Sequence, residues 1–259
     1  MIPRLLSVAS SDSGGGAGIQ ADIKAFARCG AHGMTAIVAL TAQNTLGVTA
    51  IEELPPAFVR AQIEAVLDDI GADAVKTGML FSAPLIEAVA DALAPRRLPL
   101  VVDPVMLAST GAVLLREDAV ETLIARLFPL ATVVTPNLPE AQLLTQLKTE
   151  DRAELAETIV AMGAPAVVIT GGHGADPVDH LYDGSAHVPI RVARVPVDAT
   201  HGAGCTHSAA LATGLAVGLP LAAAARRAAR VAADAVAHGL EDIGDGDGPV
   251  HVLHGAAGS

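Results

Sequence analysis

Residues 200–206, THGAGCT, have the clearest potential for chemistry in this chain, because they lead into an alanine-rich stretch of helical period. At a helix N-terminus the first backbone amides have no intrahelical partner, and the helix dipole adds roughly half a positive charge. The amides of Gly202, Ala203, Gly204 and Cys205 therefore form an expected anion hole. It would suit a group that gains negative charge during reaction, such as a transferring phosphoryl.

The thiol of Cys205 lies within this expected anion hole. A helix N-terminus lowers a cysteine pKa from about 8.5 toward 7 or below, so we predict a thiolate that acts as general base on a substrate hydroxyl. Asp198 is a competing base. The alternative for Cys205 is a small buried residue that packs the helix start.

A second glycine segment, residues 10–18 (SSDSGGGAG), follows an expected strand and opens a helix. Glycines without Cβ would let a ligand lie against bare backbone there. The segment is not a dinucleotide-binding fingerprint, because Ile19 stands where the third glycine should fall, and the chain has no GxxxxGK[ST] motif. Asp22 and Lys24, on the following helix, fit a solvated helix surface when taken alone.

Asn137 and Glu140 stand at an expected strand-to-helix junction. Their spacing matches a capping box, which is a purely structural device, and it also suits a carboxylate that holds Mg²⁺ through water. The nine histidines include no HExxH motif, so we discount a zinc enzyme. Gln43, with Asn44 and Thr45, offers polar groups that could bind a heterocycle, although the trio alone reads as a turn.

Short β-branched runs alternate with longer helical patterns, which predicts βαβ units around a mostly parallel sheet with helices on both faces. With neither a low-complexity linker nor an internal repeat, we expect one α/β domain over residues 1–259. The expected strands are 5–9, 35–40, 74–76, 98–102, 132–135 and 166–170, with an antiparallel piece at 181–182 and 187–192. The expected helices are 17–28, 56–70, 84–93, 117–127, 139–144, 151–162, 204–214 and 221–239.

Five of these strands end in polar or glycine-bearing segments. In an open parallel sheet such ends share one edge, where ligands bind, so we predict a cleft there. Ordinary turn chemistry is the alternative for any one of them. The segments are 10–14, 76–78, 103–104, 135–137 and 170–172.

The composition excludes several classes of protein. Hydrophobic residues make up 51%, enough for a sizeable core, and no apolar run approaches the ~18–20 residues of a membrane span. We expect a cytoplasmic protein, because the N-terminal apolar stretch is too short for a signal peptide and the two cysteines form no CxxC pair. A net charge of −12 with one Tyr and no Trp argues against nucleic-acid binding.

Seven motifs in chain order, ending before residues 248–251 (GPVH), together resemble one family. The chain is similar to the hydroxymethylpyrimidine/phosphomethylpyrimidine kinases of thiamin biosynthesis, in the ribokinase-like superfamily. The motifs are residues 11–24 (SDSGGGAGIQADIK), 42–45 (AQNT), 75–80 (VKTGML), 103–106 (DPVM), 135–141 (TPNLPEA), 171–173 (GGH) and 200–206 (THGAGCT).

The resemblance implies a single ribokinase-like α/β domain, usually a homodimer, that uses ATP and Mg²⁺. It would phosphorylate 4-amino-5-hydroxymethyl-2-methylpyrimidine and then its monophosphate. Carried over by position, Asp22 and Gln43 would hydrogen-bond the aminopyrimidine, Met79 and Val105 would sandwich its ring, and Gly18 would line the same pocket.

The resemblance also implies roles in phosphoryl transfer. Cys205, with the amides of residues 202–204, would be catalytic, and Lys76 would neutralise the transferred phosphate. Asp103 and Glu140 would serve the metal. The implied ATP contacts are Asn137, Thr170, Gly172, Thr200 and Arg230.

Three positions depart from the family pattern. Ala203 stands where Thr is usual, Ala229 stands where a lysine that touches nucleotide phosphates is common, and Asp245 replaces a frequent His. Two other functions stay open: a pyridoxal or pyridoxine kinase, and a pyrimidine-binding regulatory protein that has lost transfer.

Overall fold

The computed structural model describes residues 1–106, 115–171, 178–191, 197 and 199–255, and its centre is a nine-stranded sheet. The strand order is β3-β2-β1-β4-β5-β6-β7-β8-β9. The strands are β1 (Arg4–Asp12), β2 (His32–Asn44), β3 (Gly47–Glu53), β4 (Ala74–Thr77), β5 (Leu100–Val102), β6 (Val133–Val134), β7 (Val167–Ile169), β8 (Val178–Tyr182) and β9 (His187–Arg191).

The six strands from β2 to β7 in this order pair in parallel, so the expected mostly parallel sheet is confirmed. Strands β8 and β9 add an antiparallel edge. The sequence pattern missed β3, which pairs antiparallel with β2 at the other edge. This strand is mostly exposed or half-buried, so it lacks the run of apolar residues that marks a buried strand.

The expected helices are all present. They are α1 (Gly18–Arg28), α2 (Pro56–Asp69), α3 (Ala83–Leu93), α4 (Glu117–Arg126), α5 (Leu138–Thr145), α6 (Arg152–Ala161), α7 (Ala203–Ala216) and α8 (Leu221–Ala237), with short 3₁₀ turns η1 (Ala94–Arg96) and η2 (Phe128–Leu130).

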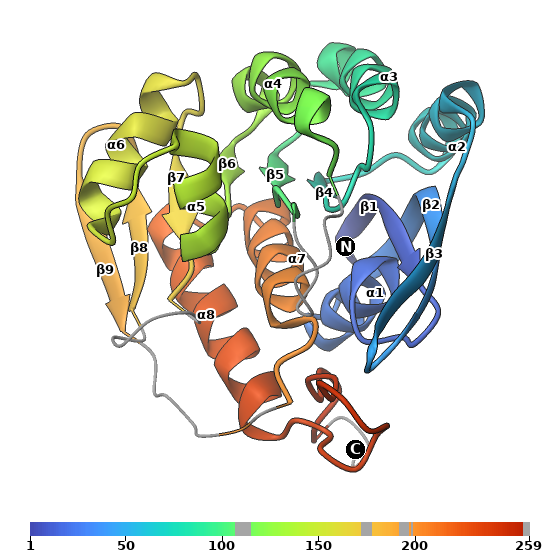
Figure 1. Ribbon diagram of the computed structural model, residues 1–259. Helices are drawn as coiled ribbons and strands as arrows, with labels where there is room; N and C mark the ends of the chain where they lie inside the picture. The colour runs from blue at the N-terminus through green and yellow to red at the C-terminus, as the bar shows by residue number, and fades with distance from the viewer. Residues whose placement is uncertain (107–114, 172–177, 192–196, 198, 256–259) are drawn as a thin grey trace.

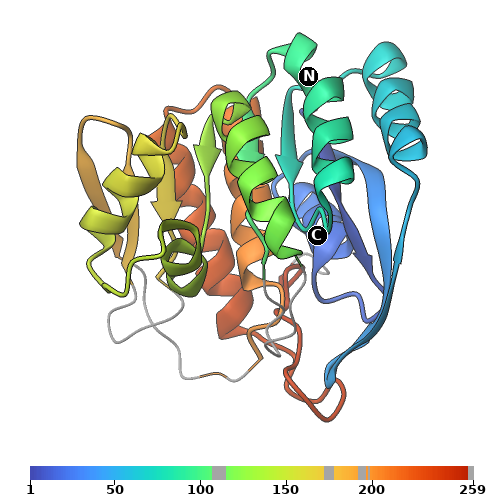
Figure 2. The same ribbon diagram turned by 45° about the horizontal axis from the view of Figure 1, so that its top comes forward.

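Helices cover both faces of the sheet, as expected. Side chains of α2 to α6 pack on one face, and side chains of α1, α7 and α8 pack on the other. Figure 2 shows α3 and α4 in front of the sheet and the orange and red α7 and α8 behind it. Alternate residues of one strand serve the two cores: Val102 faces the first and Val101 the second.

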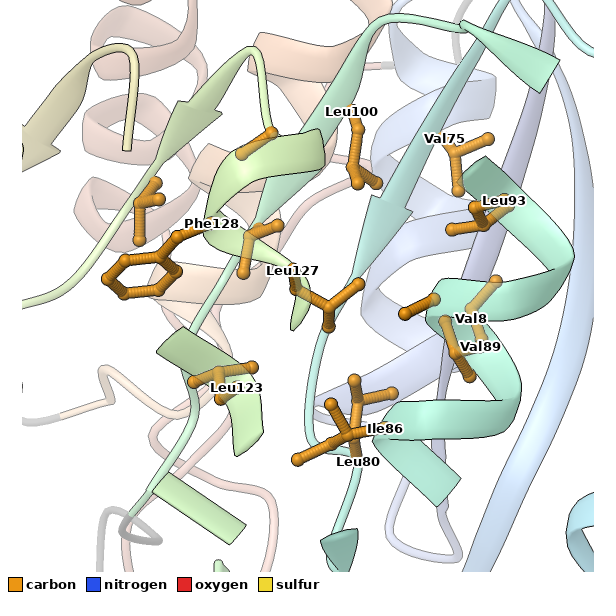
Figure 3. Close-up of a cluster of buried hydrophobic side chains, with 14 of the residues drawn as sticks. Val8, Val75, Leu80, Ile86, Val89, Leu93, Leu100, Leu123, Leu127 and Phe128 are labelled. Atoms are coloured by element: carbon orange, nitrogen blue, oxygen red, sulfur yellow. The ribbon is translucent and has the colours of Figure 1, made fainter. Parts of the chain in front are cut away.

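Figure 3 shows part of the first core, where Val8 and Val75 of the sheet meet Ile86 and Val89 of α3. Phe128, with no exposed surface, closes this core beyond α4. Each fully buried side chain of this size contributes about 1.5–3 kcal/mol, so the core holds the strand ends in place.

The carboxyl ends of the parallel strands share one edge, toward the bottom of Figure 1, and α7 begins at that same edge. Among the helices that the structure describes, none has both the length and the apolar character to cross a bilayer. The edge with the strand ends is where the predicted site residues must be sought.

Candidate active site

A fully buried lysine, Lys76 of β4, lies at the centre of the site. Its Nζ donates to both carboxylate oxygens of Asp22, at 2.9 and 3.0 Å, and lies 3.8 Å from Oδ2 of Asp103. The Ser7 hydroxyl also donates to Asp22, at 2.5 Å. Burial alone would lower the pKa of Lys76, but the charges of Asp22 and Asp103 outweigh it and raise that pKa, so the ammonium stays charged.

Asp22 is not the solvated helix residue that its position alone indicated, because its side chain has no exposed surface. Both of its oxygens are occupied by Lys76 and Ser7. The carboxylate therefore holds Lys76 in place, and its expected hydrogen bond to a pyrimidine stays a prediction.

The start of α7 has the form of an anion site. Gly202 is the N-cap residue at φ 86°, and a Cβ there would overlap the carbonyl oxygen of Gly16, so only glycine fits. Within the described part of the chain, the amides of Gly204 and Cys205 make no backbone hydrogen bond. A Cβ on Gly204 would meet no heavy atom within 4 Å, so open space lies beside these amides.

The expected anion hole is smaller than the sequence indicated. The amide of Ala203 donates to the carbonyl oxygen of Thr200 at 3.1 Å, because residues 200–203 form a turn before the helix. Ala203 therefore offers no free donor, which leaves the amides of Gly202, Gly204 and Cys205 without a backbone partner in the described part of the chain.

Cys205 lies beside the charged cluster, but its predicted ionisation is wrong. Burial raises the pKa of the thiol to about 12, and the charges of Asp22 and Asp103 add to this rise. Lys76 and a hydrogen bond from the Gly18 amide act in the opposite direction without cancelling it. The desolvation of the thiol outweighs the helix dipole, so Cys205 is a neutral thiol at neutral pH in this state of the protein.

The glycine loop after β1 closes around Asp12. Its carboxylate accepts the amides of Gly14, Gly16 and Ala17 at 2.8 to 3.0 Å, and Nε2 of His201 lies 3.0 Å away. Burial opposes ionisation, but these hydrogen bonds, led by His201, hold the pKa of Asp12 below its usual range. The loop is thereby tied to the segment that precedes α7.

Gln43 reaches the same network from β2, not from a turn. Its Nε2 lies 3.3 Å from Nε2 of His201, and its Oε1 accepts from Thr41 at 3.0 Å. Its backbone amide donates to the Ser13 hydroxyl at 2.8 Å. The amide group therefore stands beside the glycine loop, where a heterocycle could be bound.

Two carboxylates face each other at the ends of β5 and β6. Asp103, 5% exposed, accepts from the Ser208 hydroxyl of α7 at 2.8 Å. Glu140, 4% exposed, forms the predicted capping box with Asn137, because each backbone amide donates to the partner's side chain at 2.9 Å. Burial, reinforced by the charge of Asp103, raises the pKa of Glu140 to about 8.

This pair fits a hydrated magnesium ion. The Thr135 hydroxyl, next to Asp103 on the neighbouring strand, is buried and makes no hydrogen bond with any described residue. The described residues contain no cluster of three or more His, Cys, Asp or Glu that could hold a metal. Two carboxylates and an unpaired hydroxyl suit Mg²⁺, which keeps several waters and takes few protein ligands.

The remaining predicted residues lie at several places along this edge. Met79 is buried, with its sulfur 3.5 Å from the Ser10 hydroxyl, and Val105 is half-buried after β5. The Thr170 amide donates to Pro136 at 2.9 Å, beside Asn137. Thr200 and Arg230 are exposed, and Gly172 and Asp198 lie outside the described residues. The binding roles of these residues stay predictions.

Sequence reasoning missed four contributors: Ser7, Asp12, His201 and Ser208. Asp12 and His201 stood inside motifs that we had noted, without a role. Ser208 lies one turn after Cys205 on the same helix face, a spacing that could have indicated it. Nothing in the sequence marked Ser7, because its partner Asp22 comes from another element.

Comparison with known proteins decides the family. Residues 12–251 match the model of the family described as phosphomethylpyrimidine kinase. The chain belongs to this family. The expected α/β, ribokinase-like fold class and the resemblance seen in the sequence are thereby confirmed.

A relative from Rhizobium meliloti named hydroxymethylpyrimidine/phosphomethylpyrimidine kinase is 49% identical, and the alignment covers 96% of each chain. Among solved structures, a phosphomethylpyrimidine kinase of Clostridium difficile has 39% identity and a TM-score of 0.78, covering 89% of this chain and 97% of that one. An ADP complex of Bacillus subtilis pyridoxal kinase has 37% identity and a TM-score of 0.87, covering 98% of both chains.

Replacement of the buried lysine in this member of the phosphomethylpyrimidine kinase family tests the core of the site. Lys76→Met leaves Asp22 buried without its cation, so we expect the free energy of unfolding to fall by about 3–5 kcal/mol in urea titrations. Adding Asp22→Asn should restore much of it. The control, Lys148→Met on the exposed surface, should stay within about 0.5 kcal/mol of the wild type. Equal effects of Lys76→Met and Lys148→Met would contradict the assignment.

The raised pKa of Glu140 predicts a pH-dependent stability in metal-free buffer. Its folded pKa of about 8 exceeds the unfolded value of about 4.3, so its protonated form stabilises the fold, and this contribution is lost between those pH values as pH rises. The Tm of Glu140→Gln minus that of the wild type should therefore increase from pH 5 to pH 8. MgCl₂ at pH 8 should raise the Tm of the wild type more than that of the variant. A pH-independent difference would contradict the raised pKa of Glu140.

Proposed function

We propose that this protein is the kinase that phosphorylates 4-amino-5-hydroxymethyl-2-methylpyrimidine, and then its monophosphate, in thiamin biosynthesis, with ATP as donor and Mg²⁺ as metal. The observation that carries the proposal is the open space at the start of α7. There the unpaired amides of Gly204 and Cys205 lie beside the cluster of Lys76 and Asp103. The family match of residues 12–251 supports the substrate class.

Different residues along the sheet edge would bind the pyrimidine and stabilise the transferred phosphoryl group. Gln43, Met79 and Val105, from β2 and the ends of β4 and β5, would hold the pyrimidine. The amides of Gly204 and Cys205 would donate hydrogen bonds to oxygens of the transferred group as negative charge develops on them. Buried Lys76 adds a positive charge that is already in place before the reaction. Such positioning and electrostatic stabilisation supply most of the catalysis in phosphoryl transfer.

Asp103 and Glu140 would hold Mg²⁺, with the Thr135 hydroxyl beside them. A bound Mg²⁺ neutralises charge on phosphate oxygens and orients them for in-line transfer. Loss of the proton from Glu140 would accompany metal binding, because the cation removes the repulsion from Asp103. Asn137 fixes the Glu140 side chain through the capping box.

Cys205 is the proposed proton acceptor for the substrate hydroxyl, as the sequence analysis expected, although a neutral thiol accepts no proton. The thiol would first have to lose its proton to solvent in the reacting complex; Lys76 and the Gly18 amide favour this ionisation, and burial opposes it. Asp103, an acceptor already within the cluster, is the alternative base. In a loose transition state for phosphoryl transfer, the attacking hydroxyl needs little help from a general base, whichever group serves as that base.

A pyridoxal kinase is the second candidate, because the solved structure with that name has a TM-score of 0.87. Gln43 would favour the aminopyrimidine over pyridoxal as substrate, since its amide can hydrogen-bond both the amino group and a ring nitrogen of an aminopyrimidine. A catalytically weakened pyrimidine-binding regulator is a third possibility, motivated by Ala203 and Ala229.

We further propose a single kinase domain over residues 1–259, a cytoplasmic location and a homodimer. The continuous sheet supports the first proposal. Exposed Leu40 and Leu46, at 45% and 65%, lie on the β2–β3 hairpin, whose outer strand is a free sheet edge that suits a partner. Analytical ultracentrifugation of the purified protein measures the oligomeric state, and we expect the mass of a dimer.

An ADP-release assay with the hydroxymethylpyrimidine, its monophosphate and pyridoxal in parallel tests the function. We expect Mg²⁺-dependent release with both pyrimidines and a kcat/KM at least about tenfold lower with pyridoxal, which corresponds to about 1.4 kcal/mol. A preference for pyridoxal would establish the second candidate. Pyrimidine binding in calorimetry without any ADP release would establish the regulator.

The role of Cys205 makes a separate prediction. Cys205→Ala should lower kcat by about 10²–10⁴-fold and leave pyrimidine binding largely intact. With a thiol pKa of about 12, kcat/KM for the pyrimidine should rise up to pH 9 in the wild type and lose that rise in Cys205→Ala. Cys29→Ala, at the other cysteine, is the matched control. An active Cys205→Ala enzyme with an unchanged pH profile would assign the proton to Asp103.

A further inference from the structure

Two buried polar residues outside the cluster around Lys76 contact each other across α7 and β8. Nε2 of His207 lies 3.1 Å from Oδ2 of Asp179, and the two residues are 3% and 5% exposed. Burial opposes ionisation of Asp179, but His207 and the Gly171 amide hold its pKa below the usual range. The pair is therefore an imidazole against a buried carboxylate, on helix and strand elements that also supply the second hydrophobic core.

The second oxygen of Asp179 reaches the end of the neighbouring strand. Oδ1 accepts the backbone amide of Gly171 at 2.7 Å, directly after β7. A Cβ on Gly171 would overlap the backbone of Val178, so the two strand ends are packed backbone to backbone. Thr170, one residue earlier, bridges to Asn137. Asp179 thus fixes the corner of the site next to the capping box of Glu140.

His207 connects this corner to the helix that carries the anion site. The next residue of α7, Ser208, donates to Asp103 at 2.8 Å. Two consecutive side chains of one helix thus contact β8 on one side and the end of β5 on the other, which fixes the rotation of α7 about its axis. Neither ring nitrogen of His207 makes a hydrogen bond of good geometry within the described residues, so the 3.1 Å approach of Nε2 to Oδ2 of Asp179 is a close polar contact between the two side chains.

We propose that His207 and Asp179 form a positioning pair that sets the start of α7 against the corner of Thr170, Gly171 and Asn137. The inference rests on the proposed kinase function. Because the pair lies on the β7–β8 side of the sheet, whereas Gln43, Met79 and Val105 lie on the β2–β5 side, it serves the phosphate donor and not the pyrimidine. A misplacement near 1 Å of such groups costs about 10²-fold in rate.

The test compares His207→Leu, which removes the contact at similar volume, with His207→Gln, which keeps a polar group within reach of Asp179. We expect His207→Leu to raise KM for MgATP, and the Kd of a non-hydrolysable ATP analogue, by about tenfold. KM for the pyrimidine should change less than about twofold. His207→Gln should recover part of the loss. Thr213→Val, a buried polar-to-apolar change on the same helix far from the site, controls for lost stability.

Asp179→Ala supplies the second arm, since it removes the contacts to both His207 and Gly171. If the pair acts as a unit, the double variant with His207→Leu should lose no more affinity for the analogue than Asp179→Ala alone. Equal losses for both substrates, additive losses in the double variant, or an unchanged Kd in His207→Leu would overturn the proposal. Calorimetry with the analogue needs no turnover, so a wild type that binds it but releases no ADP would refute the proposed function and not the pair.

Discussion

A charged lysine held without exposed surface is the constraint on which the rest of the site depends. Lys76 stays charged chiefly because its Nζ donates to both carboxylate oxygens of Asp22, at 2.9 and 3.0 Å. The Ser7 hydroxyl donates a further hydrogen bond to Asp22. An unpaired charge at this depth would cost several kcal/mol. The three residues come from β4, α1 and β1, so those elements must pack in one way for the site to exist. The fixed charge is then available to Cys205 and Asp103 without any movement.

Around this charge, the site is organised by close backbone contact more than by side chains. Gly202 lies directly on Gly16, and the loop that contains Gly16 is wrapped around Asp12. His201 bridges that loop to Gln43. The groups proposed to bind the pyrimidine and the phosphate therefore share one hydrogen-bonded frame, in which α7 is positioned by Ser208 and, as we infer, by His207.

The sequence predicted the elements well and the electrostatics poorly. Strand and helix patterns are local, so all eight expected helices and the mostly parallel sheet are present, whereas the exposed edge strand β3 carried too little apolar signal. The predicted ionisation of Cys205 was wrong, because its pKa is set by burial in the folded chain and by the charges of Asp22 and Asp103, which lie 100 or more residues away in the sequence. The burial of Asp22 and the contact between His207 and Asp179 are likewise non-local, and no spacing in one sequence reveals them.

The hydrogen bonds around Asp12 also limit the order in which the parts of the chain can fold. Asp12 and its partner His201 are separated by 189 positions in the chain. His201 in turn pairs with Pro249 and Val250, and Arg28 bonds the carbonyl of Val252. The amides of Gly14, Gly16 and Ala17 can satisfy Asp12 within its own loop, but the contact with His201 forms only when the segment before α7 is in place. The hydrophobic layer covered by α2 to α6 can thus form from earlier segments, whereas the site and the second layer both depend on the later docking of α7.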